Sequence, residues 1–149
     1  MKIRSLLLII FFIFFTKNSL SGDNVRVSER LHLPSRRLKG FIARGIGPVD
    51  GNDFVGGNFT AALNFSSTLP MIFTSVETAD FKFFIDAANV WGVDYRDNYD
   101  DSNKIRSSTG IAVDWFTPIG PLNFTLAQPI TKVNTDKTET FQFNLGTTF

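Results

Sequence analysis

The sequence predicts an all-β chain that crosses a membrane as an antiparallel transmembrane β-barrel, with about six strands in this chain. After residue 22, apolar and polar residues alternate with a period of two, which is the period of strands with two different faces. The apolar face is rich in phenylalanine, of which the chain has 17, whereas the opposite face carries Asn, Thr, Gln and Gly. An outer-membrane barrel needs this arrangement, because its outer face meets lipid and its interior meets water.

The first 21 residues are expected to be a signal-peptide-like segment that precedes a single domain at residues 22–149. Lys2 and Arg4 form a positive start, and an unbroken apolar run from Leu6 to Phe15 is followed by small and polar residues. This order is typical of a secretory signal, and the apolar run is shorter than the ~18 residues that a membrane helix needs. Two other interpretations stay open, namely a membrane helix and a strand that belongs to a larger parent protein.

Six segments alternate clearly enough to predict strands. The last segment is the clearest, because Phe141, Phe143 and Leu145 share one face while Gln142 and Asn144 lie on the other. In chain order, the segments are 25–33, 55–67, 80–87, 110–115, 122–127 and 138–149. Their period of two indicates strands and does not fit a helix.

The connections between these segments differ in length. Residues 34–54 and 92–104 form long connections, whereas residues 117–121 contain the tight turn Pro118-Ile119-Gly120-Pro121. Outer-membrane barrels have long loops on one side and short turns on the other. A soluble β-sandwich that binds a partner is the alternative, because its strands also bury one face, and it predicts solubility without detergent.

Composition argues against several classes of function. The net charge is +1, so no basic field favours nucleic acid as a partner. The chain has no cysteine, which excludes disulfides, thiolate metal sites and a cysteine nucleophile. His32 is the single histidine and is expected to be an ordinary residue on a polar strand face in the barrel interior. We therefore predict no enzyme, with no catalytic residues, no metal site and no cofactor.

Two clusters of charge have competing interpretations. The four aspartates between residues 94 and 101 could bind calcium, but the Gly and closing Glu of an EF-hand loop are missing, which favours a solvated external loop. A basic cluster could contact lipid phosphates or form ion pairs inside a barrel, and ion pairing is favoured. Its members are Arg36, Arg37, Lys39 and Arg44.

A set of motifs along the chain resembles one known family. The motifs are Leu38-Lys39-Gly40-Phe41, Gly45-Ile46-Gly47-Pro48, Val55-Gly56-Gly57-Asn58, Phe83-Phe84-Ile85-Asp86-Ala87-Ala88-Asn89-Val90-Trp91, Gly110-Ile111-Ala112-Val113-Asp114-Trp115 with Pro118-Ile119-Gly120-Pro121-Leu122, and Phe141-Gln142-Phe143-Asn144-Leu145-Gly146 with the closing Phe149. In this order, over about residues 21–149, they resemble the C-terminal barrel half of the BamA-type proteins in the Omp85, or bacterial surface antigen D15, superfamily. Each motif is weak alone, and the ordered set is specific.

The resemblance implies assembly and insertion of β-barrel proteins into the bacterial outer membrane, as part of a larger insertase barrel. It implies no catalysis and no cofactor. The implied partners are the outer-membrane lipid bilayer, unfolded outer-membrane protein clients and accessory lipoproteins of barrel assembly. The alternatives are a passive pore or secretion-type barrel of the same superfamily, or a non-functional fragment.

The resemblance also implies a loop that folds into the barrel and is tethered there. In the family an Arg of the loop motif pairs with acidic residues on the following strands, and Lys39 takes that position here, beside Gly40 and Phe41. Asp86 matches one acidic partner, whereas Asn64 stands where the family has a Glu. Because Lys replaces a two-pronged guanidinium by a point charge, we expect a single Lys39–Asp86 pair.

The terminal strand is the second site that the resemblance implies. The family uses its last strand as one side of a weak seam, whose exposed backbone groups can template an incoming strand. The seam residues here are Phe141, Phe143, Leu145, Gly146 and Phe149, and Gly146 is expected to loosen the strand pairing. The family barrel has about sixteen strands and is preceded by periplasmic domains. We therefore expect a fragment with a partial barrel, with a truncated product or an oligomer as alternatives.

Overall fold

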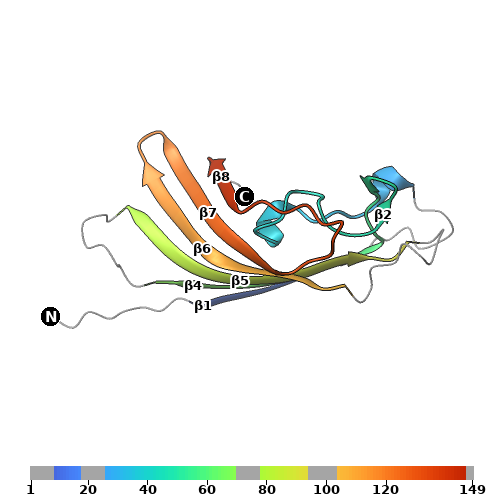
Figure 1. Cartoon of the computed structure of the whole chain (residues 1–149). Coiled ribbons are helices and arrows are strands. Elements are labelled where there is room, and N and C mark those ends of the chain that lie inside the picture. The colour runs from blue at the N-terminus through green and yellow to red at the C-terminus, as the bar shows by residue number, and fades with distance from the viewer. Residues whose placement is uncertain (1–8, 18–25, 70–77, 94–103, 147–149) are drawn as a thin grey trace.

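The computed structural model describes residues 9–17, 26–69, 78–93 and 104–146, which form an all-β structure. Six strands make one antiparallel sheet in the order β1-β4-β5-β6-β7-β8, beside a small β2–β3 hairpin (Figure 1). The strands are β1 (Ile9–Lys17), β2 (Val49–Asp50), β3 (Asp53–Phe54), β4 (Phe59–Thr68), β5 (Ala79–Trp91), β6 (Arg106–Thr117), β7 (Gly120–Thr131) and β8 (Phe141–Leu145). The large sheet is curved like part of a barrel wall, which confirms the predicted fold class.

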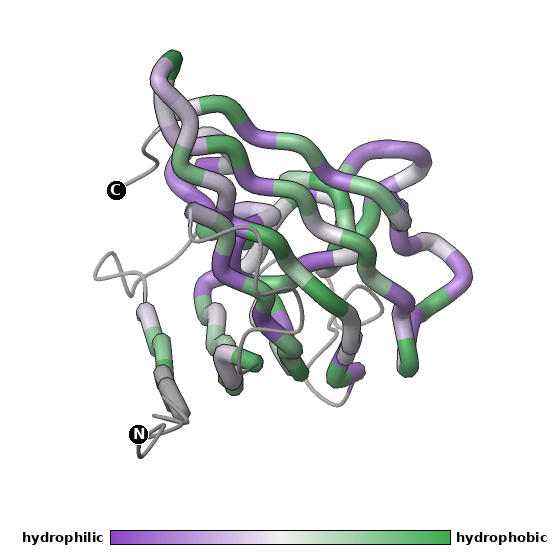
Figure 2. The backbone as a smooth tube through the Cα atoms, turned by 90° about the vertical axis from the view of Figure 1, so that its left-hand side faces the viewer, coloured by the Kyte–Doolittle hydropathy of each residue, from purple (hydrophilic) through white to green (hydrophobic). Residues whose placement is uncertain are grey.

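Hydrophobic and hydrophilic residues alternate along the strands of the large sheet (Figure 2). Its two faces therefore differ in chemistry. On the outer face, Ile111 of β6 and Leu126 of β7 are 47% and 50% exposed. Their neighbours on the inner face, Ala112 and Thr125, are buried. Because successive side chains of a strand point to opposite faces, one register fixes the sidedness of the whole sheet. The outer face presents large apolar side chains, as a lipid-facing surface requires.

Strands β5, β6 and β7 extend beyond the segments expected from the sequence, whereas β4 and β8 begin later than the expected residues 55 and 138. Strand β7 continues past Pro129, and the β6–β7 pairing shifts register opposite it, between Ser107 and Ser108. A proline has no N–H to donate to a ladder and is tolerated where a bulge interrupts the pairing. The sequence pattern is lost at this bulge, although the strand itself goes on to Thr131.

Residues 26–58, here called the inner loop, lie over the concave face of the sheet (Figure 1). The loop contains two short 3-10 helices, η1 (Val27–Glu29) and η2 (Ser35–Arg37), and the β2–β3 hairpin. Its apolar side chains pack against small residues of the sheet. This core comprises Leu33, Leu38, Phe41 and Ile46 from the loop and Ala62, Ala88 and Val90 from β4 and β5.

The prediction of a strand at residues 25–33 was wrong for the residues that the structure describes. Val27–Glu29 is a 3-10 helix, and Leu31 makes only an isolated antiparallel bridge with Gly57. The apolar alternation here has a different cause, because Leu33 is buried in the core beneath the inner loop and not in the sheet. Val25 lies outside the described residues.

The apolar run near the N-terminus forms the edge strand β1. It pairs antiparallel with β4, from Ile9 opposite Ser67 to Lys17 opposite Phe59. Of the three interpretations of this run, the strand is the one that the structure describes, while a role as an export signal stays a prediction. In the described parts of the chain, no helix is long and apolar enough to cross a membrane.

His32 lies in irregular backbone of the inner loop and not on the expected strand face. Its side chain is close to Gly56, and Arg44 is near enough to repel the protonated imidazole. Burial lowers the pKa of His32 from its usual 6.5, and the positive charge of Arg44 lowers it further by a smaller amount. The folded loop therefore opposes protonation of its histidine.

Acidification is expected to weaken the fold through His32. The unfolded chain binds a proton there near pH 6.5 and the folded chain does so only at lower pH, so the free energy of unfolding falls as the pH drops below 6.5. Urea unfolding in detergent, measured from about pH 7.5 to about pH 5.5, should show a loss of stability that His32→Gln lacks. An equal loss in both proteins would show that His32 is not its source.

A charge on the outer face should destabilise the protein according to its depth in the membrane. Leu126→Arg places a guanidinium in the middle of β7 and is expected to cost about 2–4 kcal/mol in lipid vesicles. Ile119→Arg is the matched control, because Ile119 lies in the β6–β7 turn, is 82% exposed and should cost at most about 1 kcal/mol. Equal costs for the two variants, measured by urea unfolding, would contradict a lipid-facing outer surface.

Candidate functional site

The structure brings Lys39, Asn64 and Asp86 together on the inner face of the sheet. The Asp86 carboxylate is fully buried, and the Lys39 Nζ donates to its Oδ2 at 3.0 Å. The backbone N–H of Lys39 reaches the same oxygen at 3.2 Å. The Asn64 Nδ2 donates to Oδ1 at 2.7 Å and also to the carbonyl of Arg37 at 2.8 Å. Both carboxylate oxygens of Asp86 are thus satisfied, partly by the inner loop and partly by β4.

Charge burial makes this contact more than a surface salt bridge. A carboxylate without solvent needs a counter-charge and further hydrogen bonds, because its desolvation costs several kcal/mol. Lys39 supplies the charge, and its Nζ also lies 4.4 Å from the ring centroid of Phe84, in cation–π geometry. Asn64 is neutral and donates a hydrogen bond to the Asp86 carboxylate. It therefore does not compete with Asp86 for the Lys39 ammonium group, as a second carboxylate would.

The local sequence around Lys39 explains how the loop presents this charge. Leu38 and Phe41 are 1% exposed and anchor the loop in its apolar core, so the side chain of Lys39 between them turns toward Asp86. Gly40 has a φ of +87°, and a Cβ at this position would lie 3.0 Å from the Cβ of Ala127. Only glycine combines this backbone conformation with such a close approach to the sheet.

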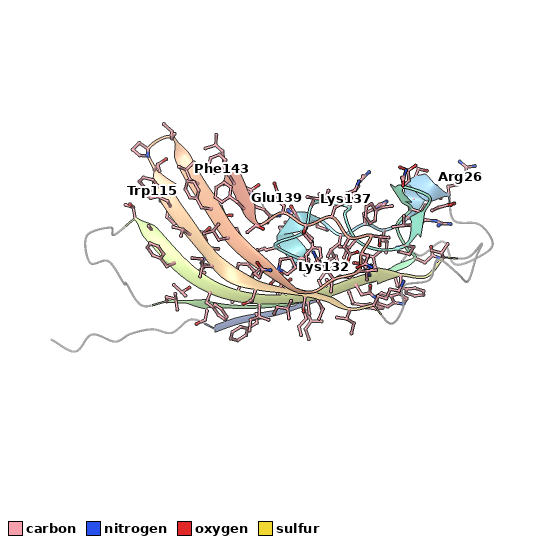
Figure 3. The ribbon with its side chains drawn as sticks, viewed as in Figure 1. Arg26, Trp115, Lys132, Lys137, Glu139 and Phe143 are labelled. Carbon is pink, nitrogen blue, oxygen red and sulfur yellow. The ribbon has the colours of Figure 1, made fainter. Side chains whose placement is uncertain are left out.

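Residues 132–140 connect β7 to β8 and run along the inner loop, and we call them the strap (Figure 3). Their backbone bonds to the loop are Ile42 N–H to Lys137 O at 3.1 Å, Lys137 N–H to Gly45 O at 2.9 Å and Glu139 N–H to Gly40 O at 3.0 Å. Phe41 and Thr138 also form an antiparallel bridge. The loop is therefore joined to the connection that leads into the last strand.

A second buried ion pair, which the sequence did not reveal, holds the strap on the sheet. The Arg106 guanidinium of β6 donates from Nε and Nη2 to the Asp136 carboxylate at 3.0–3.2 Å, and both side chains are fully buried. Arg106 also donates to Asn89 Oδ1 at 2.8 Å, and Asp136 accepts from the Val133 N–H. An Arg at an inward position of β6 was a usable signal, but its partner lies in an irregular segment 30 residues away.

The terminal strand β8 pairs with β7, and within the described residues its other edge has no strand beside it. Phe141, Phe143 and Leu145 lie on the outer face and are 51–63% exposed. Phe143 packs on Phe124 of β7, with ring centroids 5.2 Å apart. Gly146 follows the strand with a φ of +98° and donates its N–H to the Pro121 carbonyl at 2.9 Å, so it joins the end of β8 to the start of β7. Phe149 lies outside the described residues.

The other charged candidates have varied surroundings. The Arg37 guanidinium lies 4.5 Å from the ring centroid of Phe14 on β1, and Arg36 lines a cavity beside β7 and β8. Lys82, Asp114 and Asn123 form a further hydrogen-bonded network on the inner face. The aspartates between residues 94 and 101 lie outside the described residues, and the described ones contain no cluster of three metal-ligating side chains.

Comparison with known proteins agrees with this architecture. The Omp85 superfamily domain matches residues 13–149. The outer membrane protein assembly factor BamA of Neisseria meningitidis serogroup B is 30% identical over 139 residues, which cover 75% of this chain and 17% of the relative. BamA of Neorickettsia risticii is 31% identical over 132 residues, with 87% of this chain and 18% of the relative covered.

A solved structure shows the same likeness. The crystal structure of BamA from Haemophilus ducreyi lacking POTRA domains 1–3 superposes with a TM-score of 0.80 at 30% identity, and the match covers 92% of this chain and 30% of that one. The present chain spans less than a fifth of the length of the curated relatives that it matches. Its localisation is the bacterial outer membrane, and the chain belongs to the Omp85 superfamily.

Proposed function

We propose that this chain is the C-terminal part of an insertase barrel that folds and inserts β-barrel proteins into the bacterial outer membrane. The observation that carries the proposal is one connected arrangement. The inner loop is held on the concave face by the buried Asp86 carboxylate, and the same loop is joined through the strap to β8. The assembly-factor names of the matched relatives support the same role.

The proposed action of β8 is to template an incoming strand. A strand edge offers a row of N–H and C=O groups, and another chain can extend the sheet by pairing with it. In lipid this pairing is strongly favoured, because each unsatisfied backbone group costs several kcal/mol there. The outward Phe141, Phe143 and Leu145 would continue as the lipid-facing row of the new hairpin. The chemistry is non-covalent and needs neither a catalytic residue nor a cofactor.

The proposed partners follow from this action. The outer face takes the lipid bilayer, and the β8 edge takes unfolded outer-membrane proteins as clients. Accessory lipoproteins of barrel assembly complete the set that the family resemblance implies. The roles of Lys39, Gly40, Phe41, Asn64 and Asp86 in the loop tether, and of β8 in the seam, are parts of the same proposal.

Charge reversal tests the tether. The protein is reconstituted in phospholipid vesicles, and the folding rate of a denatured outer-membrane barrel is followed by its heat-modifiable gel mobility. Breaking a buried pair costs about 3–5 kcal/mol, and the partial exposure of Lys39 favours the lower end. Lys39→Ala, Lys39→Asp and Asp86→Lys should each slow assembly, by on the order of tenfold or more. The double variant Lys39→Asp/Asp86→Lys should be faster than either reversal alone.

Restoration should be partial, because the Lys39 N–H and the Asn64 amide also point at residue 86 and suit only an acceptor there. Lys82→Ala is the matched control, since Lys82 pairs with Asp114 on the same face and this pair joins β5 to β6. It should leave assembly near the wild-type rate. A double variant worse than both reversals would refute the pairing. Vesicles that conduct ions but never accelerate folding would indicate a passive pore instead.

A further inference from the structure

Gln142 links the terminal strand to the inner loop through its side chain. It lies on the inner face of β8 and is 9% exposed. Its Nε2 donates to the backbone carbonyl of Phe41 at 3.1 Å and approaches Glu139 Oε2 at 3.5 Å. The bond to Phe41 joins residues 101 positions apart in the chain. A side-chain donor from the last strand thus reaches the loop two residues after Lys39.

The acceptor of this bond is held rigidly. The Phe41 side chain is buried in the core between loop and sheet, and its backbone is bridged to Thr138 of the strap. The preceding carbonyl, that of Gly40, accepts from the Glu139 N–H. The hydrogen bond from Gln142 therefore attaches β8 to the same short segment that Lys39 fixes on Asp86.

A cavity lies between the loop and β8 beside this hydrogen bond. A cavity of about 470 Å³ separates η2 from the inner faces of β7 and β8. Its lining includes Ser35, Arg36 and Lys39 of the loop and Thr125, Gln142 and Asn144 of the two strands. Where a polar cavity replaces a close-packed core, dispersion contacts are few and a specific hydrogen bond has a larger share in holding the two parts together.

We propose that Gln142 is a positioning residue that couples the Lys39–Asp86 tether to the edge of β8. With the tether formed, Gln142 restrains the terminal strand on β7; with the tether broken, β8 opens more readily. The coupling is reciprocal, because a change at β8 shifts the loop by the same free energy as the loop shifts β8. The coupling itself does not depend on the proposed function. Its consequence does, because the restrained edge is the one proposed to receive a client strand.

Hydrogen–deuterium exchange of the protein in vesicles, without any client, tests the coupling. Gln142→Met keeps the length of the side chain and removes the hydrogen-bond donor. The backbone amides of β8 that bond to β7, and the Gly146 N–H that bonds to the Pro121 carbonyl, should then exchange about tenfold faster. Lys39→Met should raise exchange at the same amides. The double variant should add little to the larger single effect, because both substitutions break one connection.

Matched variants separate the hydrogen bond from general damage. Asn144→Leu alters the next inward side chain of β8, which lines the same cavity, and Lys82→Met removes a cation from the same face of the sheet. Both variants should leave the exchange of the β8 amides unchanged.

Gln142→Lys retains a donor for the Phe41 carbonyl and faces Glu139, so its β8 amides should exchange nearly as slowly as those of the wild type. Unchanged β8 exchange in Gln142→Met, or full additivity with Lys39→Met, would overturn the proposal. Loss of client folding alone would bear on the proposed function and not on this coupling.

Discussion

A strand in a membrane wall must show opposite chemistry on its two faces, and this constraint shapes the rest of the molecule. The outer face of the sheet carries large apolar side chains such as Leu126 and Phe143, which a lipid environment stabilises. The alternate residues of each strand point to the inner face, and many of them are polar or charged. Each of these needs a partner, because water reaches them poorly once a loop covers the face. The inner loop and the strap supply partners for Asp86, Arg106 and Gln142. Lys82, Asp114 and Asn123 instead bond to one another within the sheet.

Two ion pairs, each with a fully buried side chain from the sheet, hold the loop and the strap in different ways. Asp86 is a carboxylate of the sheet that receives its cation from the loop, whereas Arg106 is a cation of the sheet that receives its carboxylate from the strap. Buried pairs add little net stability compared with apolar packing, but a wrong arrangement leaves a charge unpaired and costs much more. They therefore select one position for each segment. The apolar core around Phe41 then contributes packing that two ion pairs alone would lack.

The sequence predicted those features that depend on local periodicity. Alternation along residues 110–115 and 141–145 fixed the sidedness of β6 and β8, and an Asp at an inward position of β5 indicated a need for a cation. The identity of that cation came from the family resemblance of the Leu38-Lys39-Gly40-Phe41 motif. Alternation misled at residues 25–33, because leucines that serve a core under a loop can follow the same spacing as a strand.

Contacts between a strand and a distant irregular segment could not be predicted from the sequence. Asp136 and Gln142 find their partners 30 and 101 residues away, and no period relates them. The extent of β7 was also missed, because Pro129 ends the pattern while a bulge in the pairing lets the strand continue. The partners of Asp136 and Gln142 and the extent of β7 thus depend on the tertiary fold, which local sequence preferences do not determine.

Spin-label accessibility in lipid vesicles measures which face of the sheet meets lipid and which meets water. The chain has no cysteine, so single cysteines can carry a label at outer positions Ile111, Phe124 and Leu126 and at inner positions Lys82, Asn123 and Asn144. Labels on the outer set should collide with oxygen dissolved in lipid, and labels on the inner set with a water-soluble nickel chelate. A protein that stays folded and monomeric in plain buffer, with the outer labels shielded from both reagents, would contradict the membrane assignment.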